Sequence, residues 1–86
     1  MNNPKAPVTV YSAVWCAYCH MAMEYLKSKG VEFKSIDVDK DPTAAQTIFA
    51  KTGQAGVPVV EIGDETILGF DRAKIDGALR ANNLVS

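Results

Sequence analysis

The two cysteines of the chain, Cys16 and Cys19, lie where the sequence pattern changes from strand to helix. Before them, residues 8–11 form a short, uncharged, β-rich run that is typical of a strand covered on both faces. After them, apolar residues recur at spacings of three and four along residues 16–29, which predicts a helix. A fold for this chain must therefore contain a strand–loop–helix unit with both sulfur atoms at the junction.

The rest of the pattern extends this unit to an α/β order. Asp41 and Pro42 are typical of a helix start, and the pair Gly63–Asp64 is typical of a two-residue hairpin turn. Further strands are predicted at residues 31–38, 57–62 and 66–68, and further helices at residues 42–53 and after Asp71. The order β-α-β-α-β-β-α predicts a mixed four-stranded sheet with helices on both faces.

Length and composition agree with one small domain. The 86 residues are 48% apolar, so residues 8–82 are predicted to form a single domain after a flexible lead-in at residues 1–7, with fraying from about Asn82. The net charge is −1 and the charges are interspersed, which argues against nucleic acid or an anionic membrane as a partner. There is no signal-peptide pattern and no apolar run of the roughly 18–20 residues that a membrane helix needs. We therefore expect a cytoplasmic protein.

In a reducing compartment, paired cysteines are more often redox-active or metal-binding than structural. Cys16 falls at the start of the predicted helix, where unpartnered backbone N–H groups and the helix dipole favour the thiolate, which is the nucleophile. Cys19 lies one turn further on the same face and should be more buried and keep its proton longer. Once Cys16 holds a mixed disulfide, Cys19 can attack it and close a Cys16–Cys19 disulfide. Such exchange needs no tightly bound cofactor.

Two other interpretations compete with redox chemistry. The cysteines could be small core residues, but Cys16 is expected at an exposed junction after Trp15. They could be half of a zinc site, but the rest of the chain offers only His20 of the nitrogen and sulfur ligands, and His20 adjoins Cys19 and cannot complete a tetrahedral site with both. We expect no metal, and we expect His20 to be an exposed side chain rather than a general base.

Several segments resemble the glutaredoxin family, within the thioredoxin-like fold, over residues 8–79. Residues 10–12 followed by Trp15-Cys16-Ala17-Tyr18-Cys19 resemble the strand and redox loop of the family, where Cys-Pro-Tyr-Cys is common. Residues 52–58 resemble the segment that leads to the family's cis-proline, and residues 69–71 resemble the turn before its last helix. The resemblance implies a thiol–disulfide oxidoreductase that reduces protein or glutathione mixed disulfides.

The resemblance also implies roles at particular positions. A cis Val57–Pro58 bond would turn the Val57 backbone towards Cys16, where an extended substrate could pair with it; a trans proline at a strand start is the alternative. Gly69 would permit close backbone approach or a bulge beside the site.

Further positions are expected to contact glutathione or another substrate. Trp15 and Tyr18 would offer apolar contact, Phe70 belongs to the glycine-containing turn, and Gln54 is the candidate partner of a glutathione carboxylate. Asp71 would cap the last helix, accept a substrate ammonium, or do both.

The electron donor stays open, because the chain departs from the family's usual pattern. Ala13 stands where a lysine or arginine is common, and Arg72 rather than a second acidic residue follows Asp71. Gly69-Phe70 instead resembles redoxins that take electrons from thioredoxin reductase, including those serving ribonucleotide reductase. Ala17, in place of the loop proline, resembles dithiol glutaredoxins that assemble an iron–sulfur cluster between two subunits. The chain is otherwise expected to be a monomer.

Overall fold

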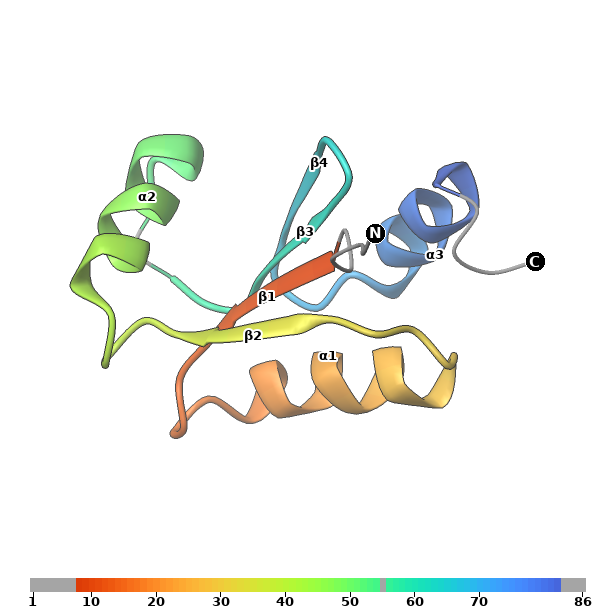
Figure 1. The fold of residues 1–86 in the computed structure, drawn as a ribbon, viewed down its shortest axis with the longest axis horizontal. Helices are drawn as coiled ribbons and strands as arrows, with labels where there is room; N and C mark the ends of the chain where they lie inside the picture. Colours follow the sequence, from red (N-terminus) through yellow and green to blue (C-terminus); the bar gives the residue numbers. More distant parts are fainter. Residues whose placement is uncertain (1–7, 55, 83–86) are drawn as a thin grey trace, which may run out of the picture.

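The structure is a computed structural model that describes residues 8–54 and 56–82. The predicted lead-in at residues 1–7 falls outside these ranges, as do residues 83–86 of the segment predicted to fray from about Asn82. The described chain contains four strands and three helices in the expected order β-α-β-α-β-β-α (Figure 1). The elements are β1 (Val8–Ser12), α1 (Ala17–Ser28), β2 (Lys34–Asp37), α2 (Pro42–Thr52), β3 (Val59–Ile62), β4 (Glu65–Leu68) and α3 (Arg72–Ala81).

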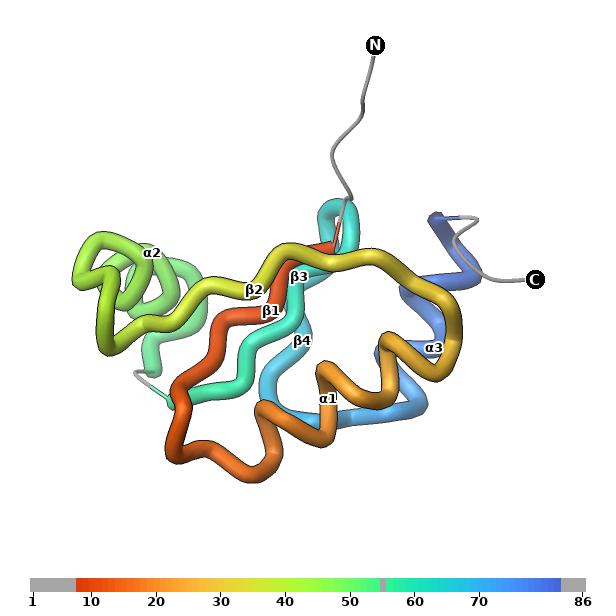
Figure 2. The backbone as a smooth tube through the Cα atoms, turned by 60° about the horizontal axis from the view of Figure 1, so that its bottom comes forward, coloured from red at the N-terminus to blue at the C-terminus, as the bar shows by residue number. Residues whose placement is uncertain are grey.

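The strands form one mixed sheet in the order β2-β1-β3-β4. β1 pairs with β2 in parallel and with β3 antiparallel, and β3 and β4 form an antiparallel hairpin around Gly63–Asp64. α1 and α3 lie on one side of the strands and α2 lies on the other (Figure 2). The mixed four-stranded sheet with helices on both faces is therefore confirmed.

Each face of the sheet carries its own core. Alternation along β1 turns Val8 and Val10 towards α1 and α3, and it turns Tyr11 towards α2. The larger core packs the first face against Leu26 and Leu79, both fully buried. The smaller core joins Tyr11 to residues of α2, β3 and the end of β2. Each fully buried aliphatic side chain of this kind stabilises the fold by about 1.5–3 kcal/mol.

Two strands begin later than the sequence pattern predicts. β2 starts at Lys34 rather than residue 31, because the Val31 N–H donates to the Leu26 carbonyl at 3.0 Å and so closes the end of α1. Val31 is buried in the larger core, and its apolar character reflects that packing rather than a strand. β3 starts at Val59 rather than residue 57, since Pro58 has no N–H to give to a sheet.

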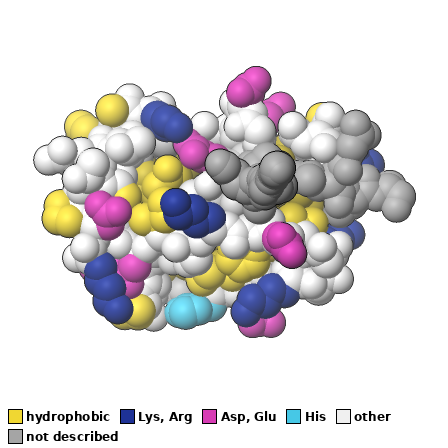
Figure 3. Space-filling model, in the orientation of Figure 1, with side chains coloured by type: hydrophobic (Ala, Val, Ile, Leu, Met, Phe, Trp, Pro, Cys, Tyr) yellow, Lys and Arg dark blue, Asp and Glu magenta, His cyan; other side chains and the backbone are white. Residues whose placement is uncertain are grey.

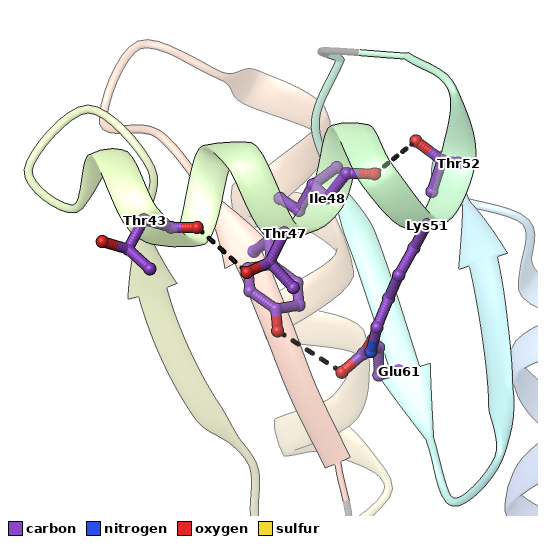
Figure 4. Close-up of polar contacts among 7 residues, drawn as sticks. Thr43, Thr47, Ile48, Lys51, Thr52 and Glu61 are labelled. Carbon is purple, nitrogen blue, oxygen red and sulfur yellow. Dashed lines mark hydrogen bonds and ion pairs between the residues drawn. The ribbon is translucent and has the colours of Figure 1, made fainter.

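α2 is fastened to the sheet by polar contacts around Glu61, on β3 (Figure 4). The Tyr11 hydroxyl donates to Glu61 Oε1 at 3.4 Å, and Lys51 of α2 pairs with Glu61 Oε2. Burial, and then the charge of Glu61, raise the pKa of Tyr11. The three side chains join β1, β3 and the last turn of α2.

The outer surface is of mixed charge. On the face drawn in Figure 3, lysine and arginine side chains alternate with aspartate and glutamate side chains, as the interspersed charges of the sequence predict. None of the helices in the described ranges is long and apolar enough to cross a membrane.

Candidate active site

Cys16 is the N-cap residue of α1. Its backbone is extended, with φ −95° and ψ 107°, and its Sγ accepts a hydrogen bond from the Cys19 N–H at 3.1 Å. Serine, threonine, aspartate or asparagine usually fills this place, so here a sulfur takes the position of a capping oxygen. The helix begins at Ala17, one residue later than predicted. The expected placement of a sulfur at the positive end of the helix is confirmed.

The sulfur of Cys16 is more covered than the sequence predicts. The residue is only 6% exposed, although its neighbours Trp15 and Tyr18 are 69% and 64% exposed. The expectation of an exposed Cys16 is therefore wrong at the level of the side chain. The cover comes from Ala13 and from Val57, which is 41 residues away in the chain, and no local pattern could reveal that contact.

Cys19 lies one turn deeper and is fully buried. Burial, followed by the hydrogen bond with Cys16, raises the pKa of the Cys19 thiol to about 12. Both cysteines are free thiols. The expectation that Cys19 is the more buried of the two is confirmed, and its raised pKa agrees with the expectation that it keeps its proton.

The Val57–Pro58 peptide bond is cis, as the resemblance implied. The Val57 carbonyl oxygen lies 3.9 Å from Cys16 Sγ, so the Val57 backbone faces the sulfur. The Pro58 carbonyl accepts a hydrogen bond from the Gly69 N–H at 2.9 Å. This bond joins the loop before β3 to the segment between β4 and α3. Gly69 has φ +76°, and an added Cβ would meet nothing within 4 Å. Gly69 therefore serves a left-handed backbone, and of the two expected roles, close approach or a bulge, the close approach is absent.

Four exposed apolar side chains lie before and after Cys16 in the chain, and we call them the apolar rim: Val14, Trp15, Tyr18 and Met21. Sequence reasoning identified Trp15 and Tyr18 and missed the other two. The i,i+3 spacing of Tyr18 and Met21 on α1 was the available signal for Met21. His20 is exposed, as expected, and its Nε2 donates to the Val14 carbonyl at 3.0 Å.

The other predicted site residues have different surroundings. Asp71 is the N-cap of α3, and its Oδ1 accepts the Lys74 N–H at 3.2 Å, so its capping role is confirmed. Phe70 is half-buried against the larger core and meets the Tyr25 ring edge-on, with centroids 5.9 Å apart. Gln54 is exposed just after α2, and its N–H donates to Thr52 Oγ1 at 3.1 Å. The cluster around the sulfur atoms contains only Ala13, Cys16, Cys19, Met23 and Val57.

Within the described residues, no three histidine, cysteine, aspartate or glutamate side chains gather where they could hold a metal ion. What the site presents is two free thiols, one capping a helix and one buried beneath it, opposite a cis-proline loop. Together with the mixed four-stranded sheet and its flanking helices, this defines a thioredoxin-like thiol–disulfide oxidoreductase.

Comparison with known proteins names the family within that class. The sequence profile described as Glutaredoxin matches residues 8–67, and the chain belongs to the glutaredoxin family. It is 36% identical over 69 residues to a glutaredoxin-like 8.6 kDa protein of Clostridium pasteurianum, covering 80% of this chain and 92% of that one.

Solved structures agree with this assignment. The glutaredoxin of Archaeoglobus fulgidus superposes with a TM-score of 0.80 at 31% identity, over 87% of each chain. The glutaredoxin-like NrdH-redoxin of Escherichia coli superposes with a TM-score of 0.76 at 31% identity, over 81% of this chain and 91% of that one.

Proposed function

We propose that this protein reduces disulfides by dithiol exchange, with Cys16 as the nucleophile and Cys19 as the resolving thiol. The observation that carries the proposal is the contact of Cys16 Sγ with the Cys19 N–H at the start of α1, 3.1 Å long. A negative sulfur is favoured there by the N–H group and by the helix dipole. The high pKa of Cys19 keeps its thiol protonated, so it does not compete for the substrate.

The exchange proceeds in two steps that together move two electrons. The Cys16 thiolate attacks one sulfur of the substrate disulfide; a Cys16–substrate bond forms, the substrate bond breaks, and the other sulfur leaves as a thiolate that takes a proton from water. Cys19 then loses its proton and attacks Cys16 Sγ. The second substrate sulfur leaves as a thiolate and takes up, through water, the proton that Cys19 lost, and a Cys16–Cys19 disulfide remains. Two thiols of an external donor return it to the dithiol form.

The surroundings of the sulfur assign supporting roles. The Val57 N–H and C=O would pair with an extended substrate backbone, since the carbonyl already lies 3.9 Å from Cys16 Sγ. Trp15 and Tyr18, both exposed, would contact the substrate's apolar groups. Asp71, half-buried at the start of α3, would accept a substrate ammonium, and Gln54 would receive a carboxylate.

Two electron donors are consistent with this chemistry. Glutathione is favoured by the Cys-Ala-Tyr-Cys motif and the likeness to glutaredoxins. Thioredoxin reductase, with ribonucleotide reductase or a similar enzyme as acceptor, is favoured by the likeness to NrdH-redoxin, whose structure is described as explaining a thioredoxin-like activity profile. Ala13 also favours the reductase, because it is 2% exposed beside Cys16 and offers no cation for a glutathione carboxylate.

One coupled assay separates the two donors. NADPH oxidation is followed with glutathione and glutathione reductase in one arm, and with thioredoxin reductase in the other. We expect turnover in at least one arm, and that arm identifies the donor. Absence of turnover in both, with a folded and reduced protein, would contradict the proposed activity.

The roles of the two cysteines are tested by substitution. We expect Cys16→Ser to abolish disulfide reduction and Cys19→Ser to accumulate a mixed disulfide that mass spectrometry detects, while a reaction with glutathionylated substrates persists. Ala50→Ser, at an exposed position on α2, is the matched control and should behave as the parent. A mixed disulfide trapped on Cys19 in Cys16→Ser would reverse the assignment.

The expected cytoplasmic location and monomeric state stay predictions, as does the alternative of an iron–sulfur cluster shared by two subunits. In that alternative each chain contributes Cys16 Sγ and glutathione supplies the other ligands. Anaerobic purification with glutathione would give a coloured dimer if the cluster forms and a colourless monomer if it does not.

A further inference from the structure

The apolar rim holds four of the six large apolar side chains that are exposed in the described residues. Val14 and Trp15 are each 69% exposed, and Tyr18 and Met21 follow at 64% and 48%. All four fall within residues 14–21, on either side of the nearly covered Cys16. Exposed apolar side chains concentrated in one short segment are typical of an interaction surface, whereas an ordinary protein surface exposes such side chains singly.

Trp15 is held in place by a residue that the mechanism above does not use. Its Nε1–H donates to Asp39 Oδ2 at 2.7 Å, across 24 residues of sequence. The acceptor is a carboxylate, so the bond is of the stronger, charge-assisted kind. The main chain of Asp39 is held in turn, because its N–H donates to Asp37 Oδ1 at 2.9 Å in the turn that follows β2.

The backbone that carries Trp15 is held as well. The Cys16 N–H donates to the Ala13 carbonyl at 3.1 Å and closes the turn. The Val14 carbonyl faces His20 Nε2 at 3.0 Å, and a carbonyl can only accept, so Nε2 carries the hydrogen. The indole is thus fixed through its side chain by Asp39 and through its main chain by α1.

We infer that Asp39 is a positioning residue that sets the substrate class of the site: it holds Trp15 as a preformed contact for an apolar side chain next to the disulfide of a protein substrate. This inference rests on the proposed function. An untethered tryptophan would lose rotational freedom when a substrate binds, and fixing it beforehand removes that loss. A small anionic disulfide such as oxidised glutathione has no apolar side chain to place on the indole. Its carboxylates would also be repelled by the carboxylate of Asp39.

The test uses two synthetic peptides, each with one disulfide, that differ only in leucine or serine beside one cysteine. Dithiothreitol supplies the electrons, so the outcome does not depend on the physiological donor. We expect Asp39→Ala to raise KM for the leucine peptide roughly threefold to tenfold, with kcat and the serine peptide within about twofold of the parent. Asp39→Asn keeps an acceptor oxygen and should recover most of the loss. Asp64→Ala, in the exposed β3–β4 turn, is the acidic control.

The hydrogen bond between Trp15 and Asp39, which we call the tether, can be followed by fluorescence, because Trp15 is the only tryptophan in the chain. We expect Asp39→Ala to speed the decay of its fluorescence anisotropy and increase its quenching by acrylamide, at an unchanged circular dichroism spectrum. Equal losses for both peptides, a loss in kcat alone, or unchanged mobility of Trp15 would overturn the inference. If the parent protein reduces neither peptide, the proposed function fails, and the fluorescence measurement still tests the tether by itself.

Discussion

At the scale of single residues, the two cysteines differ in burial and in chemical role because one caps a helix and the other lies in its first turn. Cys16 caps α1 and is 6% exposed, whereas Cys19, three residues later, faces the core and is fully covered. The N–H of Cys19 stabilises the sulfur of Cys16, and burial stabilises the protonated thiol of Cys19. The order of attack in the proposed exchange follows from this difference.

The raised pKa of Cys19 predicts how the stability of the reduced protein depends on pH. The unfolded thiol ionises near its ordinary pKa of 9.0, while the folded thiol keeps its proton until about 12. Between these values the folded state binds more protons, so the free energy of unfolding falls as pH rises above 9. Urea unfolding of the reduced protein from pH 7 to pH 10 measures this fall.

Cys19→Ser is the control for that measurement, because serine does not titrate in this range. Tyr11 has a raised pKa as well, but its unfolded pKa of 10.0 places its contribution higher. We therefore expect the parent and Cys19→Ser to diverge between pH 9 and pH 10. Parallel curves over this interval would contradict the buried, protonated thiol.

The two roles of Asp71 can be separated by two substitutions. Asp71→Ala removes the cap of α3 and should lower the free energy of unfolding by about 1 kcal/mol. Asp71→Asn keeps a capping oxygen and should leave stability nearly unchanged. If the carboxylate also accepts a substrate ammonium, Asp71→Asn raises KM for oxidised glutathione without changing the melting temperature. An unchanged KM would leave capping as the role of Asp71.

At the scale of elements, the start of β3 decides how the site is assembled. β1 and β3 run antiparallel with Tyr11 opposite Val59, so the end of β1 meets the start of β3. The loop after β1 carries Cys16 and the loop before β3 carries Val57. The pairing of the strands places Cys16 Sγ 3.9 Å from the Val57 carbonyl oxygen. The site therefore lies at one end of the two central strands because of strand direction.

The contact of α2 with the sheet predicts a modest effect on stability. The Lys51 side chain is 49% exposed, so its ion pair with Glu61 should contribute at most about 1 kcal/mol. We expect Lys51→Met to lower the free energy of unfolding by up to that amount at low salt, and the difference to shrink at high salt. Urea unfolding at two salt concentrations measures both values.

Glu61→Gln tests the same contact from the sheet side. It removes the charge that Lys51 pairs with and keeps an oxygen that can accept from the Tyr11 hydroxyl. We expect it to resemble Lys51→Met, and the two substitutions together to cost less than their sum. A fully additive pair of losses would show that the ion pair contributes nothing of its own.

At the scale of the whole molecule, one sheet with a core on each face supports the site. The larger core joins β1, β3 and β4 to α1 and α3, so α1, which Cys16 caps and which contains Cys19, is held by packing rather than by a disulfide. This arrangement lets the Cys16–Cys19 bond form and break while the fold persists.

Leu79→Ala tests the dependence of the site on this core. Leu79 is fully buried in α3, and its truncation should lower the free energy of unfolding by about 2–5 kcal/mol. In a domain of this size the melting temperature should fall by at least about 8 °C. Arg80→Ala, at the next and exposed position, should change it little. Below the melting transition, both variants should keep their activity, since neither residue contacts the cysteine cluster.

The sequence alone determined the element order, the placement of both cysteines at the start of α1, and the caps at Asp41 and Asp71. These features depend on hydrogen bonds and apolar spacing within a few residues of the chain, so a local pattern carries them. The cis bond at Pro58 was reached through the resemblance to a family rather than from a local pattern.

Only the tertiary structure decided how covered Cys16 is and which residue holds Trp15. Val57 covers Cys16 from 41 residues away, and Asp39 reaches Trp15 from 24 residues away. Such contacts depend on how strands pair and on where the chain returns after each helix. The sequence of a segment does not by itself predict which distant residues will pack against it.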